Sequence, residues 1–156
     1  MTLQIVPTSW ASWDFKVADG VRALADIDMS CWREKGLLTV EGQVYQVHRE
    51  GLLSGEFLLE GPGGVLARAE KPSPLNHTFV VHHAGREYTL RRRSVWGRAA
   101  ALLAGSEEIG SITPRSAFMR KAEADLPQHL PLAVRMFIIW LAVVSWRRDA
   151  AAASGG

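Results

Sequence analysis

Short runs of alternating apolar and polar residues fill most of the chain, and glycine-containing turns separate them. The run DFKVADGVRALADIDM predicts two strands joined at Asp19-Gly20, a strong two-residue hairpin signal. Similar signals stand at Glu41-Gly42, at the GPGG of residues 61–64, at Ala84-Gly85 and at Gly105-Ser106. With further strands near the two ends of this series, the pattern predicts about a dozen strands. Their regular spacing is typical of an antiparallel sandwich or barrel.

The alternation also predicts which side chains face inward. In REYTLRR, Tyr88 and Leu90 share one face, and Glu87, Thr89 and Arg91 fall on the other. In GVLARAEK, the residues Val65, Ala67 and Ala69 share one face. Small residues on an inner face would leave room for something inside the sheet.

The most apolar run of the chain, PLAVRMFIIWLAVVSW, has a helical pattern instead. Pro131 suits the first position of a helix, and nothing from Leu132 to Trp146 breaks one. Apolar residues cover its whole circumference, as in a helix buried in a core or in a membrane. These fifteen residues reach roughly 22 Å, which is short of a hydrocarbon core of about 30 Å.

The two patterns fit together, because a closed barrel of many strands has a lumen that must be filled. We expect a mainly β single domain at residues 1–149, an antiparallel closed barrel of about 12 strands around a central hydrophobic C-terminal helix at about residues 131–147. Residues 150–156 are expected to form a disordered tail. A membrane anchor formed by the same helix is the alternative. The expected core residues of the helix are Leu132, Val134, Phe137, Ile138, Leu141 and Val144.

This arrangement resembles the tubby C-terminal-like superfamily, which includes tubby proteins, phospholipid scramblases and LURP-one-related proteins. The hairpin segments, such as FLLEGPGGVLARAEKP, and the closing segment FMRKAEADLPQHLPLAVRMFIIWLAVVSWRRD carry the likeness. It covers nearly the whole chain and is architectural, without a short diagnostic motif. The many Trp and Ala residues look bacterial. The resemblance implies a non-enzymatic module, with binding of anionic membrane lipid or phosphoinositide headgroups as the best-known family activity.

Composition and charge exclude some classes of binding partner and of site. A net charge of +2 reflects a small arginine surplus and does not indicate a nucleic-acid-binding protein. The single cysteine, Cys31, excludes a disulfide framework and a thiolate zinc site within one chain, and we expect it to be buried and inert. No secretory signal is recognisable at the N-terminus. We therefore expect a cytoplasmic monomer, associated with membranes peripherally if at all.

One basic cluster is a candidate for binding anionic lipid. It consists of Arg91, Arg93, Arg98 and the intervening Trp96, since arginine forks suit phosphate and an exposed Trp suits a headgroup surface. Strand alternation places Arg92 on the opposite face from Arg91 and Arg93. The alternative is a solvated strand end with a core tryptophan.

No catalytic or metal-binding pattern stands out, and we expect neither an enzyme nor a bound cofactor. His82 and His83 are adjacent on a strand and point to opposite faces, so with His77 they form a poor metal site. There is no Gly-x-Ser-x-Gly elbow, although a Ser-His-Asp set could still be assembled by the fold. A protein-interaction module is the second functional alternative, with an exposed patch formed by Trp10, Trp13 and Trp32. The competing interpretation is that these tryptophans close the barrel ends.

Overall fold

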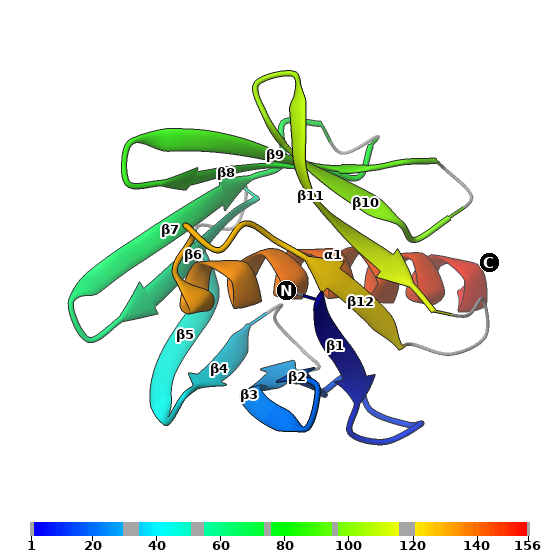
Figure 1. Ribbon diagram of the computed structural model, residues 1–156. Coiled ribbons are helices and arrows are strands. Elements are labelled where there is room, and N and C mark those ends of the chain that lie inside the picture. The colour runs from blue at the N-terminus through cyan, green and yellow to red at the C-terminus, as the bar shows by residue number, and fades with distance from the viewer. Residues whose placement is uncertain are drawn as a thin grey trace.

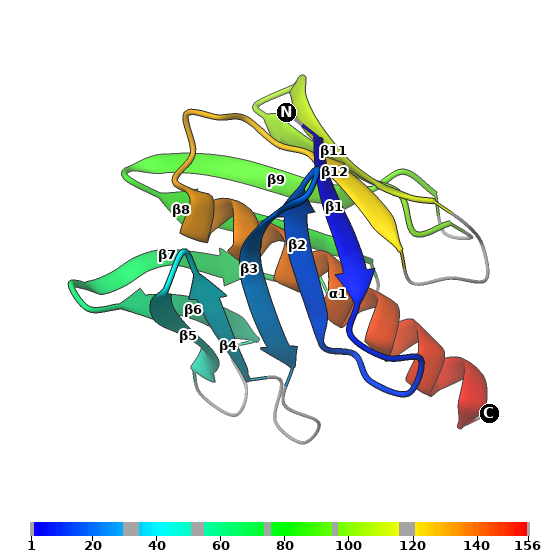
Figure 2. The same ribbon diagram turned by 60° about the horizontal axis from the view of Figure 1, so that its bottom comes forward.

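The computed structural model describes residues 2–29, 35–50, 55–73, 76–94, 97–115 and 121–155. Within these ranges twelve antiparallel strands close into one barrel, and a single helix runs through it (Figures 1 and 2). The predicted fold class is therefore confirmed. The elements are β1 (Thr2–Pro7), β2 (Phe15–Asp19), β3 (Arg22–Met29), β4 (Gly36–Val40), β5 (Gln43–Glu50), β6 (Glu56–Gly61), β7 (Gly64–Glu70), β8 (Thr78–His83), β9 (Arg86–Arg92), β10 (Ala100–Ala104), β11 (Glu107–Pro114), β12 (Ala122–Asp125) and α1 (Leu132–Ser154).

Each strand pairs with its neighbours in the chain, and the barrel closes between the first and the last strand. Leu3 of β1 lies opposite Ala124 of β12 in that closing register. The predicted hairpin turns are all present, between β2 and β3, β4 and β5, β6 and β7, β8 and β9, and β10 and β11. Gly20 and Gly42 show why glycine stands in these turns, because their φ angles of 59° and 82° are in the left-handed region.

The two ends of the barrel differ, because successive strands run in opposite directions. The five hairpin turns meet at one end, which we call the turn end. The longer connections, from β1 to β2, β3 to β4, β5 to β6, β7 to β8, β9 to β10 and β11 to β12, join strand ends at the other, which we call the loop end. The helix α1 starts at the turn end, and its last turns emerge at the loop end (Figure 2). Connecting loops carry function more often than strands do, so the loop end is the first place to search for a site.

The core of the protein is α1 together with the inner face of the barrel. Val134, Phe137, Ile138 and Leu141 are fully buried and Val144 is nearly so, as predicted. Leu132 is half-buried at the mouth of the barrel, because it is the first residue of the helix. Almost every residue of α1 up to Trp146 is buried. The all-round apolar pattern therefore reflects burial on every side by the barrel wall.

The helix differs from the prediction at its C-terminal end. It continues to Ser154 instead of ending at about residue 147, and residues 150–154 are helical although they were expected to form a disordered tail. The physical reason is the run of alanines from Ala150 to Ala153, since alanine has the highest helix propensity. These last residues are exposed, so propensity and not burial extends the helix. Within the described residues, no helix has the length and apolar character needed to cross a bilayer.

Small residues on the inner face make room for α1, with one departure from the predicted alternation. Ala67 and Ala69 are buried, as expected. Val65, however, is 51% exposed. The register between β6 and β7 shifts, so that Leu59 pairs with Ala67 and Glu60 with Val65. The extra residue, Leu66, is a bulge that turns Val65 outward.

At Gly36 the barrel wall lies close to the helix. A Cβ atom there would lie 2.5 Å from Nε1 of Trp140 and 3.0 Å from the carbonyl oxygen of Asp28. We therefore expect Gly36→Ala to lower the free energy of unfolding by about 1–3 kcal/mol, the usual cost of overpacking. Urea denaturation measures this, with Gly63→Ala as the matched control because nothing lies within 4 Å of its Cβ position. Equal midpoints for the two variants would contradict the close contact.

Candidate anion site at the loop end

The predicted basic cluster does not form a single site. Arg91 is exposed on the outer face, and Arg93 is exposed beside it but forms an ion pair with Glu108. The guanidinium of Arg98 lies 5.8 Å from the ring centroid of Trp146, on the helix. Trp96 lies outside the described residues. Arg91, Arg93 and Arg98 therefore have different surroundings and do not converge on one point.

Arg92, which alternation placed on the other face, points into the barrel. It is the last residue of β9 and follows the buried Leu90 by two positions. Its side chain is only 7% exposed. One guanidinium nitrogen, Nη1, donates a hydrogen bond to Oδ2 of Asp149 in α1. The other, Nη2, is buried and has no hydrogen-bond partner among the described residues.

Asp149 also faces a histidine from the opposite side. Its Oδ1 lies 3.5 Å from Nε2 of His77, the residue immediately before β8. Partial burial lowers the pKa of His77, and the positive charge of Arg92 lowers it further, while Asp149 acts in the opposite direction. Lys71 and Arg148 also lower this pKa. Positive charge therefore outweighs negative charge around His77, which favours its neutral form.

A small cavity adjoins the buried guanidinium. Its volume of about 10 Å³ is enough for one water molecule. Trp146 closes part of it, with Nε1 donating a hydrogen bond to the carbonyl oxygen of Arg98 at 3.1 Å. The cavity is lined by His77, Leu90, Arg92, Arg98, Ala100, Ala142, Ser145 and Trp146. These residues come from two strands, two connections and the helix, so only the folded barrel brings them together.

This arrangement suits an anion better than it suits catalysis. Two arginines line the cavity and further cations lie nearby, and guanidinium groups bind phosphate and carboxylate oxygens through charge-assisted hydrogen bonds. Ser145, His77 and Asp149 do meet here, but not as nucleophile, base and orienting acid. The Ser145 hydroxyl donates to the carbonyl oxygen of Leu141 at 3.3 Å, and Nε2 of His77 faces the carboxylate. A serine without a base beside it is a weak nucleophile.

Three other histidines lie near local oxygen atoms, although Nε2 of His82 has no hydrogen-bond partner among the described residues. Nδ1 of His83 lies 2.8 Å from the carbonyl oxygen of Leu66. His82 lies within 4 Å of Glu70 and Glu87, and Nε2 of His48 is 3.5 Å from Glu60. Nowhere in the described part of the chain do three His, Cys, Asp or Glu side chains gather closely enough to hold a metal ion.

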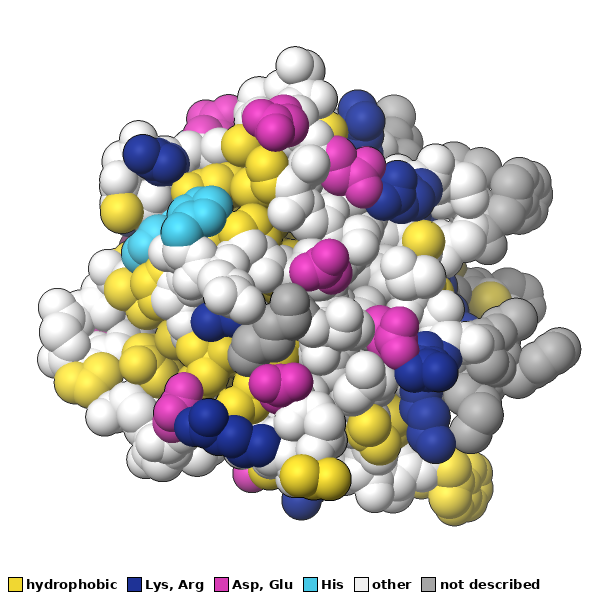
Figure 3. Space-filling view, viewed as in Figure 1, with side chains coloured by type: hydrophobic (Ala, Val, Ile, Leu, Met, Phe, Trp, Pro, Cys, Tyr) yellow, Lys and Arg dark blue, Asp and Glu magenta, His cyan; other side chains and the backbone are white. Residues whose placement is uncertain are grey.

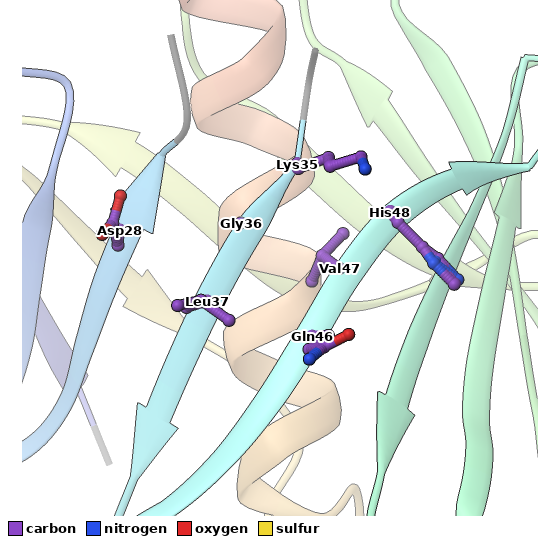
Figure 4. Close-up of a pocket in the computed structure, with 7 residues that line it drawn as sticks. All are labelled: Asp28, Lys35, Gly36, Leu37, Gln46, Val47 and His48. Carbon is purple, nitrogen blue, oxygen red and sulfur yellow. The ribbon is translucent and has the colours of Figure 1, made fainter. Parts of the chain in front are cut away.

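A larger cavity lies on the wall formed by β3, β4 and β5 (Figure 4). It has a volume of about 320 Å³ and is lined by Asp28, Lys35, Gly36, Leu37, Gln46, Val47 and His48. Figure 4 shows these side chains pointing in several directions instead of toward one point. It has one carboxylate and one ammonium group, and His48 pairs with Glu60. The lining of this cavity therefore favours neither an anionic nor a cationic ligand.

The surface of the barrel carries no continuous charged patch on the face shown in Figure 3, where basic and acidic side chains are interspersed.

The tryptophans that could close the barrel ends differ in their burial. Trp10, in the connection from β1 to β2, is 91% exposed and closes nothing, whereas Trp13 packs against the core near Trp146. Trp32 and Cys31 lie outside the described residues.

Comparison with protein-family models, curated proteins and solved structures gives no match to this chain. The resemblance to the tubby-like group consequently rests on the barrel and its central helix alone. The function has to be argued from the loop end itself.

Proposed function

We propose that this chain is a non-enzymatic module that binds anionic membrane headgroups at the loop end of its barrel. The observation that carries the proposal is the buried guanidinium of Arg92, whose Nη2 has no partner among the described residues. A buried charged donor without an acceptor costs free energy. An oxygen atom of a bound phosphate would remove that cost, and the surrounding positive charge would favour it.

The position of the site suits a membrane surface. Trp10, which is 91% exposed, belongs to the connection from β1 to β2 and so stands at the same end as Arg92. Indole rings favour the headgroup region of a bilayer. Lys71 and Arg148 add positive charge near the site. Together these residues support peripheral binding, with the loop end facing the lipid.

The proposal agrees with what the tubby-like resemblance implies, namely a non-enzymatic module that binds membrane lipid headgroups. A cytoplasmic location, peripheral membrane association and the lack of a cofactor or nucleic-acid partner are part of the proposal. A bacterial origin and a monomeric state belong to the same proposal. Arg91, exposed on the outer face of β9, would add to the attraction at longer range. The alternative partner is a protein, which would bind without the salt sensitivity expected of headgroup binding.

The variant Arg92→Gln tests the proposal. We expect it to weaken binding to vesicles of phosphatidylcholine and phosphatidic acid about tenfold, since a charged hydrogen bond contributes about 1.5–3 kcal/mol. The control is Arg22→Gln, which removes the same charge from an exposed ion pair with Glu41 at the turn end. Co-sedimentation measures both affinities, and circular dichroism checks folding. Equal weakening by both variants would show that total charge, and not this site, drives binding.

A further inference from the structure

The candidate anion site is already occupied by a carboxylate. The cavity beside Arg92 has room for about one water molecule, so it is too small for a phosphate group as it stands. Asp149 accepts a hydrogen bond from Nη1 of Arg92, and its other oxygen faces His77. An anion can therefore reach these donors only if the carboxylate leaves them.

We infer that Asp149 is an internal ligand of this site, which an incoming phosphomonoester displaces; this inference rests on the proposed function. The carboxylate has two oxygens, and each faces one cationic or polar partner, Arg92 or His77. It leaves Nη2 of Arg92 unsatisfied. A phosphomonoester has three terminal oxygens and close to two negative charges at neutral pH. It can engage both nitrogens of Arg92 and the ring of His77 at once, which the carboxylate does not do.

The position of Asp149 allows its carboxylate to leave the site without disturbing the buried core. It follows Trp146, the last buried residue of α1, and its side chain is 40% exposed. The residues after it are exposed, and the helix ends without a basic residue in its last turn. Few packing contacts hold these final turns. Loss of the ion pair with Arg92 should consequently loosen the helix from Asp149 to Ser154, while the buried part of α1 stays in place.

The variant Asp149→Asn tests the displacement. It removes the competing charge, so we expect about tenfold tighter binding to vesicles of phosphatidylcholine and phosphatidic acid than the natural chain shows. Asp26→Asn is the matched control, because Asp26 forms an exposed ion pair with Lys16 on the outer wall. Its affinity should not change beyond the effect of one unit of charge. An Asp149→Asn affinity equal to or below that of the natural chain would overturn the inference.

Hydrogen exchange of the natural chain gives a second readout that needs no variant. We expect the amides of residues 150–154 to exchange faster when phosphatidic acid vesicles or inorganic phosphate are bound, and the amides of residues 134–146 to be unaffected. Unchanged exchange at residues 150–154 with ligand bound would overturn the displacement. Response to inorganic phosphate without vesicle binding would identify a soluble phosphate compound as the ligand, and response to vesicles alone would identify a lipid.

The outcomes separate this inference from the proposed function. If the natural chain and Asp149→Asn bind the vesicles equally, the anion site stands and only the displacement fails. If neither binds vesicles or inorganic phosphate, the proposed function fails and the inference fails with it. Thermal unfolding confirms that each variant is folded, and Asp149→Ser repeats the test if the asparagine variant does not fold.

Discussion

A chain truncated after Leu130 will not fold. The truncation removes α1, which is the centre of the hydrophobic core. The inner face of the barrel would then be exposed to water, including the fully buried Phe57, Phe79 and Leu102. Among the described residues, no other element could fill the apolar lumen of this twelve-stranded barrel.

The size of the effect follows from the side chains that are lost. Burial of one large apolar side chain contributes about 1.5–3 kcal/mol, whereas a whole domain is stable by only about 5–15 kcal/mol. Even at the lower value, the sum for α1 reaches about 15 kcal/mol, the upper end of that range. The large apolar residues of α1 that are buried are Val134, Met136, Phe137, Ile138, Ile139, Trp140, Leu141, Val143, Val144 and Trp146.

The matched control is a chain that ends at Asp149. It lacks only the exposed helical residues 150–154 and the last two glycines, so we expect it to fold with nearly the stability of the full chain. Expression, circular dichroism and chemical-shift dispersion compare the two truncated chains. A folded, cooperative remnant after truncation at Leu130 would show that the strands form a core without the helix.

Trp140→Ala will have the largest effect of any single large-to-small substitution. Trp140 is the largest of the fully buried side chains. Its ring lies edge-to-face with Phe57, 5.2 Å between ring centroids, and its centroid is 6.5 Å from that of Phe137. Truncation of a buried Trp or Phe to Ala costs about 3–5 kcal/mol, because a cavity remains in addition to the lost transfer free energy. This is a large part of the stability of a domain, so we expect a much lower midpoint of urea denaturation.

Trp140→Phe is the control that separates ring packing from hydrogen bonding. Nε1 of Trp140 has no hydrogen-bond partner among the described residues. The phenylalanine variant consequently loses part of the ring but no hydrogen bond, and it should be clearly more stable than Trp140→Ala. It should also tolerate Gly36→Ala better, since Nε1 is the atom nearest to the added Cβ. Equal losses in the alanine and phenylalanine variants would point to an unseen partner of the indole.

The barrel can be predicted from the sequence because the turn and strand signals are local and recur along the chain. Each hairpin has its own turn residues, such as Asp19-Gly20 and Glu41-Gly42, and the strands between them alternate. The helix was predictable for another reason. A run that is apolar on all sides and too short for a bilayer has to be buried in protein, and a barrel of this many strands offers the space.

The structure differs from the prediction at Val65 and at the end of α1. The bulge at Leu66 depends on the register with β6, so the outward position of Val65 could not be read from β7 alone. The predicted helix is shorter than α1 because the prediction assigns Ala150 to Ala153 to the tail, whereas their high helix propensity extends the helix to Ser154.

The candidate site was missed for a related reason. The prediction chose the exposed arginines Arg91 and Arg93, whereas the structure buries Arg92 beside Asp149. Alternation places Arg92 on the opposite face from Arg91 and Arg93, which the structure shows to be the inner face. A charged residue on an inner face needs a partner there. The identity of that partner, 57 positions away in the chain, depended on the fold.

The most direct test of the account is the binding of the natural chain to vesicles. Co-sedimentation with phosphatidylcholine vesicles that contain phosphatidic acid should retain the protein at low salt, and retention should fall as salt is added. Vesicles of phosphatidylcholine alone should not retain it. Absence of binding to the acidic vesicles at low salt, with the protein folded, would contradict the binding of anionic membrane headgroups at the loop end of the barrel.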